Sequence, residues 1–424
     1  MRAALLAALL LSAPATAQDF FTLKGHGGPI MGIAVARSGR IATASFDNAV
    51  GLWQGPAPQW LDGHEAAVNA VAFVDDNRLV SAGDDFTLRL WPGGTVLGRH
   101  QGKILGLAVS PDRSLVASAS WDGSIGLWPL DGAPGRLLQG HAQGVNAVTF
   151  APDGRLYSAS VDGTIRLWDT ATGTELREIV RHGFGVNELV LSPEGWLAYG
   201  AVDGVTRIVD PETGREIADF TLERRPILAL ALSPDGSRLA VGDGEGYIMM
   251  IDTQSWQIAT DFRATLRGPV WALAFSADGL NIHAGGLDEA MYSWPVAAMD
   301  GDRMAGAQPS FLKKPEEMEN GERQFARKCS ICHSLTPDSG RRAGPTLHGL
   351  FGRQAGSVTD YRYSEILDGS PIVWNEASIN SLFDLGPDHF IPGSKMPMQR
   401  ITDAGDRADL IAFLRRATAP GGTK

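Results

Sequence analysis

The stretch Val161-Asp162-Gly163-Thr164-Ile165-Arg166-Leu167-Trp168 decides the fold of most of this 424-residue chain. Its Asp-Gly turn and the alternating residues up to Trp168 predict a short strand that begins after a tight turn. The same pattern, with an aspartate six residues before a tryptophan, occurs at Asp47 and Trp53, Asp85 and Trp91, and Asp122 and Trp128. Three later units keep the spacing, and two of them lose the indole: Asp203 with Val209, Glu245 with Ile251, and Asp288 with Trp294. Seven units with a period near 40 indicate a repeat architecture.

A histidine stands about 21 or 22 residues before the aspartate in five units, as His26, His64, His100, His141 and His182. In the first four units a hydroxyl residue stands four residues before the aspartate, as Thr43, Ser81, Ser118 and Ser158. These residues resemble the WD-repeat family, which implies an all-β seven-bladed propeller of radial four-stranded sheets over residues 18–296. The resemblance implies that histidine, aspartate, hydroxyl and tryptophan form one hydrogen-bonded network. The histidines are therefore expected to be structural and not metal ligands. Units five to seven lack members of the network, so we expect them to rely on packing alone or to serve a separate function.

The strand order also predicts how the ring closes. The last unit lacks an outer strand after Trp294, whereas Phe20-Phe21-Thr22-Leu23 forms an unassigned strand before the first unit. We expect these two strands to pair, because the pairing would remove an exposed sheet edge.

The stretch Cys329-Ser330-Ile331-Cys332-His333 is a signal for covalent haem attachment. Two thiols three positions apart can add to the two vinyl groups of one haem, and the adjacent imidazole of His333 then reaches the iron. A zinc site would need four ligands, and the chain has only these two cysteines. One haem c, held by Cys329 and Cys332, is therefore predicted.

Residues 316–424 resemble a class I cytochrome c, which implies an all-α domain after the propeller. We expect a first helix from Glu316 to Lys328 and a last helix from Asp403 to Thr418. The order of charged residues along the last helix suits the helix dipole. The resemblance implies that these helices cross closely, with Leu410 and Phe413 over Gly321 and Phe325.

The same resemblance implies the remaining haem contacts. Met396, in Ile391-Pro392-Gly393-Ser394-Lys395-Met396-Pro397, matches the family's methionine ligand; the rival ligands are Met398, Lys395, His348 and His389. The carbonyl of Pro345 is expected to accept the N–H of the proximal imidazole. Groups expected near the haem propionates, with core packing as the alternative for the aromatic residues, are Arg353, Tyr361, Tyr363, Trp374 and Ser394.

The N-terminal residues 1–17 have the layout of a cleaved signal peptide, with Arg2, an apolar run and Ala15-Thr16-Ala17. Export to the periplasm and no membrane span in the mature chain are the expectations. Residues 297–315 are predicted to be a linker. A net charge of -11 argues against nucleic acid as a partner.

These features together predict a periplasmic carrier of single electrons, with the propeller as docking platform for a redox protein that receives or supplies electrons at the haem edge. No catalytic constellation appears in the repeats. Two alternatives stay open: a haem enzyme or gas or redox sensor with a labile Met396 bond, and an assembly scaffold whose haem only reports the redox state.

Overall fold

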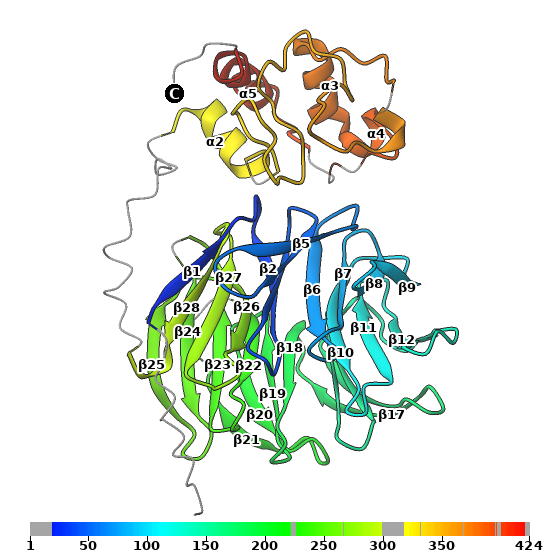
Figure 1. Cartoon of the computed structure of the whole chain (residues 1–424), viewed down its shortest axis with the longest axis vertical. Coiled ribbons are helices and arrows are strands. Elements are labelled where there is room, and N and C mark those ends of the chain that lie inside the picture. Colours follow the sequence, from blue (N-terminus) through cyan, green and yellow to red (C-terminus); the bar gives the residue numbers. More distant parts are fainter. Residues whose placement is uncertain are drawn as a thin grey trace, which may run out of the picture.

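The computed structural model describes residues 19–221, 226–265, 267–298, 318–330, 332–367, 369–394, 396 and 400–419. Seven four-stranded antiparallel sheets come first and a small helical region follows (Figure 1). The expected all-β seven-bladed propeller followed by a helical domain is thus confirmed. The predicted signal peptide and the linker beyond Ala298 lie outside the described residues.

Each of the first six blades takes four consecutive strands, from the innermost strand outward. Blades 1 and 2 are β2 (Ile30–Val35), β3 (Ile41–Ser45), β4 (Ala49–Trp53) and β5 (Pro58–Asp62), then β6 (Val68–Phe73), β7 (Leu79–Gly83), β8 (Thr87–Trp91) and β9 (Thr95–Arg99). Blades 3 and 4 are β10 (Ile104–Val109), β11 (Leu115–Ser120), β12 (Ile125–Pro129) and β13 (Arg136–Leu138), then β14 (Val145–Phe150), β15 (Leu156–Ser160), β16 (Thr164–Asp169) and β17 (Thr174–Arg181). Blades 5 and 6 are β18 (Val186–Leu191), β19 (Leu197–Ala201), β20 (Thr206–Val209) and β21 (Glu216–Asp219), then β22 (Ile227–Leu232), β23 (Arg238–Asp243), β24 (Tyr247–Asp252) and β25 (Gln257–Arg263).

Blade 7 joins the two ends of the propeller sequence. Its strands are β26 (Val270–Phe275), β27 (Asn281–Gly286), β28 (Ala290–Pro295) and, on the outside, β1 (Phe21–Lys24). The strand β1 pairs antiparallel with β28, with Leu23 opposite Met291. The predicted closure is therefore confirmed, and the outer edge of β28 is covered.

A hydrogen-bonded network repeats in blades 1 to 4. In blade 4, His141 donates from Nδ1 to Asp162 at 2.9 Å, and its Nε2 lies 2.7 Å from the Ser158 hydroxyl. The same hydroxyl accepts the indole N–H of Trp168 at 2.8 Å. Because all four polar groups are satisfied inside the blade, these histidines have a structural role there. The equivalent histidines in the first three blades are bonded in the same way: His26, His64 and His100.

Blade 5 does not rely on packing alone, so the first of the two alternatives for units five to seven was wrong for this blade. His182 lies 3.0 Å from the Asp203 carboxylate through Nε2. Tyr199 takes the place of the serine, and its hydroxyl lies 3.3 Å from Nδ1 of the same histidine. A polar network survives because a longer side chain reaches the imidazole that the missing serine would have bonded.

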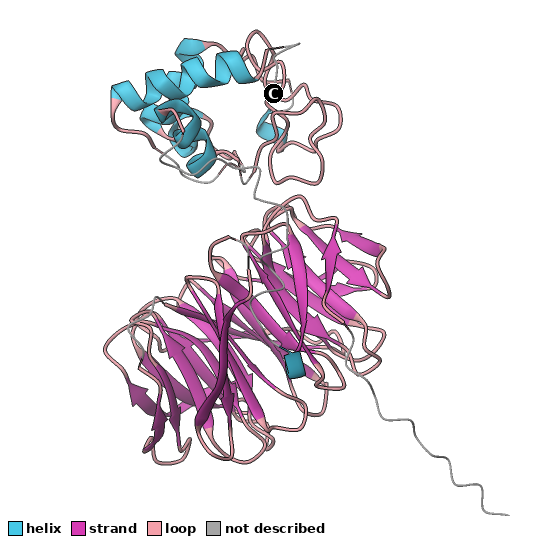
Figure 2. Cartoon of the chain, turned by 90° about the vertical axis from the view of Figure 1, so that its left-hand side faces the viewer, coloured by secondary structure: helices cyan, strands magenta, loops and turns pink. Residues whose placement is uncertain are grey.

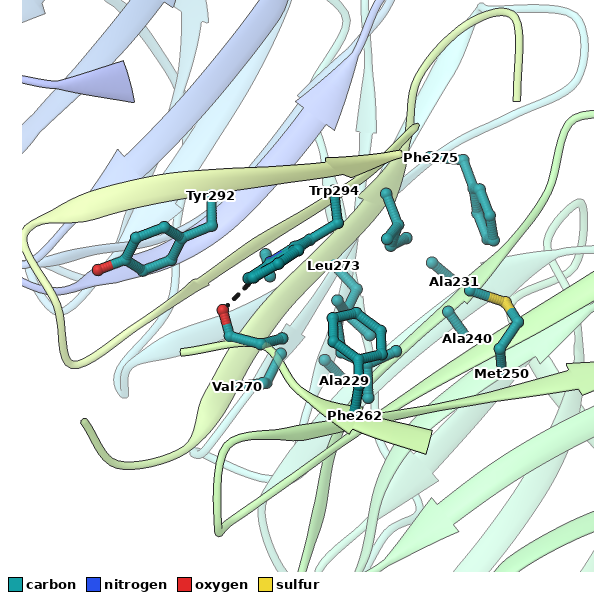
Figure 3. Close-up of a cluster of buried hydrophobic side chains, with 14 of the residues drawn as sticks. Ala229, Ala231, Ala240, Met250, Phe262, Val270, Leu273, Phe275, Tyr292 and Trp294 are labelled. Carbon is teal, nitrogen blue, oxygen red and sulfur yellow. Dashed lines mark hydrogen bonds between the residues drawn. The ribbon is translucent and has the colours of Figure 1, made fainter. Parts of the chain in front are cut away.

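Blade 7 also departs from that expectation. Asp288 accepts hydrogen bonds from Arg267 Nε at 3.1 Å and from the Tyr292 hydroxyl at 3.2 Å. The indole of Trp294 donates instead to the Ala264 carbonyl at 3.2 Å. Figure 3 shows this tryptophan among the buried side chains of blades 6 and 7.

The C-terminal region is helical and small. Its elements, after the 3-10 turn η1 (Val296–Ala298), are α2 (Asn320–Lys328), η3 (Glu365–Leu367), α3 (Glu376–Leu385), α4 (Pro387–Phe390) and α5 (Ala404–Ala417). None of the helices in the described part of the chain is both long and apolar enough to cross a membrane.

The helices α2 and α5 cross at close range, as the resemblance implied. A Cβ atom added to Gly321 would lie 2.1 Å from the Asp409 carbonyl oxygen, so only glycine fits at the crossing. The rings of Phe325 and Phe413 are 5.4 Å apart, and Leu410 is fully buried beside them. The helix α5 begins after Asp403, which caps it.

Candidate haem-binding site

Every site residue predicted from the sequence lines one cavity of about 530 Å³. Within the helical domain, its walls come from the end of α2, the long segment between α2 and α3, the helix α3, the loop before α5 and α5 itself. The ten predicted residues that line it are Cys329, Cys332, His333, Pro345, Arg353, Tyr361, Tyr363, Trp374, Ser394 and Met396.

The two cysteines and the histidine are placed by the turn that ends α2. The Cys329 N–H donates to the Phe325 carbonyl at 2.9 Å, and the His333 N–H donates to the Cys329 carbonyl at 2.9 Å. The chain therefore continues to wind after the helix, which brings all three side chains to the cavity. Burial raises the pKa of Cys329 to about 12 and that of Cys332 to about 11, so both stay thiols at neutral pH.

The ring of His333 is held by contacts on its edge and face. Nδ1 donates to the Pro345 carbonyl at 2.7 Å, which is the hydrogen bond that the resemblance implied. This bond leaves Nε2 as the ring nitrogen available to a metal. A Cβ atom on Gly344 would lie 2.4 Å from Cε1 of the ring, so the glycine allows this loop to pack against the imidazole. Burial lowers the pKa of His333, which favours the neutral form that binds iron.

Met396 lies in the same cavity and packs against an apolar cluster that includes Leu382 and Phe383. Its backbone N–H donates to the Ser394 hydroxyl at 3.0 Å. Two of its rivals, His348 and His389, are not among the described residues that line the cavity. The other two, Lys395 and Met398, lie outside the described residues.

Two of the other predicted residues, Arg353 and Tyr361, brace the loop that carries Pro345. Arg353 donates to the carbonyls of His348 at 2.7 Å and Thr346 at 2.6 Å. The Tyr361 hydroxyl donates to the Ala343 carbonyl at 2.5 Å, and burial raises the pKa of this tyrosine to about 12. These side chains therefore support the loop and also line the cavity.

Sequence reasoning missed the part of the cavity that the propeller supplies. Eight propeller residues line it: Phe46, Asn48, Glu65, Ala66, Ala67, Asp84, Phe86 and Lys103. One signal was visible, because Phe86 follows the repeat aspartate where blades 3, 4 and 5 have glycine. Sequence reasoning also missed Gly344, although a glycine beside the imidazole-orienting Pro345 indicates close approach.

The donor set fits a covalently attached haem. Two thiols, one oriented imidazole and one thioether face a single apolar cavity, and the described residues place Leu347, Leu350 and Ile379 in its walls.

Comparison with known proteins agrees with both halves of the chain. The WD domain, G-beta repeat family matches residues 18–54, 58–92, 94–129 and 132–169, and the Cytochrome c family matches residues 318–418. Cytochromes c of Sesamum indicum and Gossypium barbadense are each 41% identical to this chain over 107 residues. These 107 residues cover 25% of the chain and 94% of each relative. The cytochrome c of Gibberella zeae is 37% identical over 102 residues, which cover 24% of the chain and 95% of the relative.

The family indicates electron transfer and haem binding, and the propeller indicates protein interaction. The chain belongs to the cytochrome c family through its C-terminal domain, which is fused to a WD-repeat propeller.

Proposed function

We propose that the chain is a periplasmic mono-haem c-type cytochrome that carries single electrons, with the propeller as docking platform for a redox protein. The observation that carries the proposal is the gathering of Cys329, Cys332, His333 and Met396 around one cavity. Two axial ligands and two attachment points are what a carrier needs, because an iron with both axial positions filled exchanges electrons without binding substrate.

The haem, when bound, supplies the one-electron couple. Cys329 and Cys332 hold it through thioether bonds. The Pro345 carbonyl accepts a hydrogen bond from Nδ1 of His333, which would direct Nε2 to the iron. Met396 would supply the second iron ligand, and its soft thioether would favour the ferrous state relative to a second imidazole.

Docking of a protein partner to the propeller is the second part of the proposal. The net charge of the chain is -11, while the segment 316–424 is nearly balanced with 13 basic and 14 acidic residues. The acidity therefore lies mainly on the propeller side, and a partner with a basic face would be attracted to it. Such binding should weaken as salt concentration rises, and salt-independent binding would contradict this part.

The attachment of haem can be tested by mass spectrometry of the denatured, exported chain. We expect the mass of the chain after Ala17 plus one haem, and in Cys332→Ala a smaller haem-bearing fraction. Ser330→Ala is a matched control, because it changes the same turn without removing a thiol. Chain that loses its haem on denaturation would contradict covalent attachment. A haem-loaded chain that stays in the cytoplasm would contradict export.

A further inference from the structure

The cysteine-bearing side of the haem domain rests on the propeller. Arg342 joins the two parts, because it donates to the Ser330 carbonyl at 2.9 Å and forms an ion pair with Glu289 of blade 7 at 2.8 Å. Arg341 forms an ion pair with Asp62 of blade 1 at 2.5 Å and lies 4.1 Å over the ring of Trp60. Both views of the chain show the helical domain over one face of the propeller (Figures 1 and 2).

The backbones of the two domains also approach closely. A Cβ atom on Gly27 would lie 2.0 Å from the carbonyl oxygen of Arg341, so no other residue type fits there without a shift. The contact therefore involves backbone packing in addition to long surface side chains. This contact between the domains places the turns of blades 1 and 2 at the cavity of the haem domain.

Two aromatic residues of these turns line the cavity together with Cys329 and Cys332. Phe46 comes from the turn between β3 and β4, and Phe86 from the turn between β7 and β8. Apolar rings make this part of the cavity wall unfavourable for water.

The backbone of Phe86 is in a conformation that suits glycine. Its φ is 62°, and the residue after the repeat aspartate in blades 3 to 5 is Gly123, Gly163 and Gly204 with φ of 86°, 80° and 89°. A bulky side chain in this region is unfavourable. Phe86 is also 39% exposed, so burial within the propeller does not explain why a phenylalanine occupies this position. Strain kept at a residue that faces a cavity points to a role in that cavity.

We propose that the propeller forms one wall of the haem site, with Phe46 and Phe86 shielding the haem edge that Cys329 and Cys332 hold. The inference rests on the proposed function. Shielding from water favours the ferrous iron, because it carries less charge, and so raises the reduction potential. It also slows access of small reagents to that edge. Electron exchange through this edge then depends on how the two domains are held together.

The test compares three haem-loaded full chains: wild type, Phe86→Gly and Phe184→Ala. Phe184 is the control, because it is a 60% exposed phenylalanine in the loop between blades 4 and 5 and is not among the described residues that line the cavity. The readouts are the midpoint potential from an optical redox titration, the rate of reduction by ascorbate, and the thermal stability of the propeller.

In Phe86→Gly we expect a lower potential, faster reduction, and unchanged or higher propeller stability, because glycine relieves the backbone strain. Phe184→Ala should match the wild type in potential and rate. A Phe86→Gly chain with wild-type potential and rate would overturn the inference, as would one whose only change is a loss of stability. A wild type without low-spin haem c would instead contradict the proposed function, so the two failures are distinguishable.

Discussion

Replacing Gly344 by alanine would place a methyl group against the ring of His333. The new Cβ would lie 2.4 Å from Cε1, 2.7 Å from Nδ1 and 2.9 Å from Nε2. Ordinary carbon contacts are about 3.5 Å or more, so the imidazole would have to withdraw by about 1 Å. Metal ligand distances are kept within roughly 0.2 Å, so a displacement of this size is incompatible with an unchanged iron bond. The φ of Gly344 lies outside the left-handed region, so the backbone itself tolerates alanine.

We expect Gly344→Ala to weaken His333 ligation and to lower the free energy of unfolding of the haem domain by about 2 kcal/mol, as overpacking does. The assay is the visible spectrum of the loaded chain with a urea titration followed in the same bands. Gly405→Ala is the control, because its Cβ would meet only the Asp403 carboxylate, at 3.0 Å. A Gly344→Ala chain with wild-type spectrum and stability would refute the contact on which this reasoning depends.

Three further predictions concern the propeller. Leu23→Ala should cost about 3 kcal/mol of unfolding free energy, because Leu23 is buried at the seam between the last and first blades. The assay is thermal unfolding with the exposed residue variant Lys24→Ala as control, and a loss of stability no larger than that of the control would contradict this prediction. Ser158→Ala should cost about 2 kcal/mol in urea unfolding, because it leaves the buried indole N–H of Trp168 without its acceptor, and an unchanged midpoint would argue against the network. Burial raises the pKa of Glu188 from 4.5 to about 8, so between these pH values the folded chain keeps a proton that the unfolded chain loses. The unfolding free energy should therefore fall as pH rises from 4.5 to 8, and Glu188→Gln should remove this fall. Identical pH profiles of stability for the wild type and Glu188→Gln would count against the shift.

The repeat and the haem motif could be predicted because each depends on local spacing. An aspartate six residues before Trp168 identifies a strand and its turn in one unit, and the other units repeat it. Ring closure could be predicted from the unassigned strand at Phe20-Phe21-Thr22-Leu23, because a sheet edge needs a partner, and the structure has this strand at Phe21–Lys24.

The domain contact could not be predicted from spacing. Arg341, Asp62 and Glu289 come from three distant parts of the chain, and single charged residues carry no periodic signal. The network of blade 5 was missed for a related reason. Tyr199 replaces serine by reaching farther, so side-chain length and not residue type preserves the contact.

The most direct test of the account is the visible spectrum of the exported, reduced chain before and after addition of carbon monoxide at neutral pH. With His333 and Met396 both bound to iron, we predict a low-spin haem c spectrum that carbon monoxide leaves unchanged. Rapid binding of carbon monoxide would show that the Met396 position is open. It would contradict the electron-carrier account and favour gas sensing or catalysis at the iron.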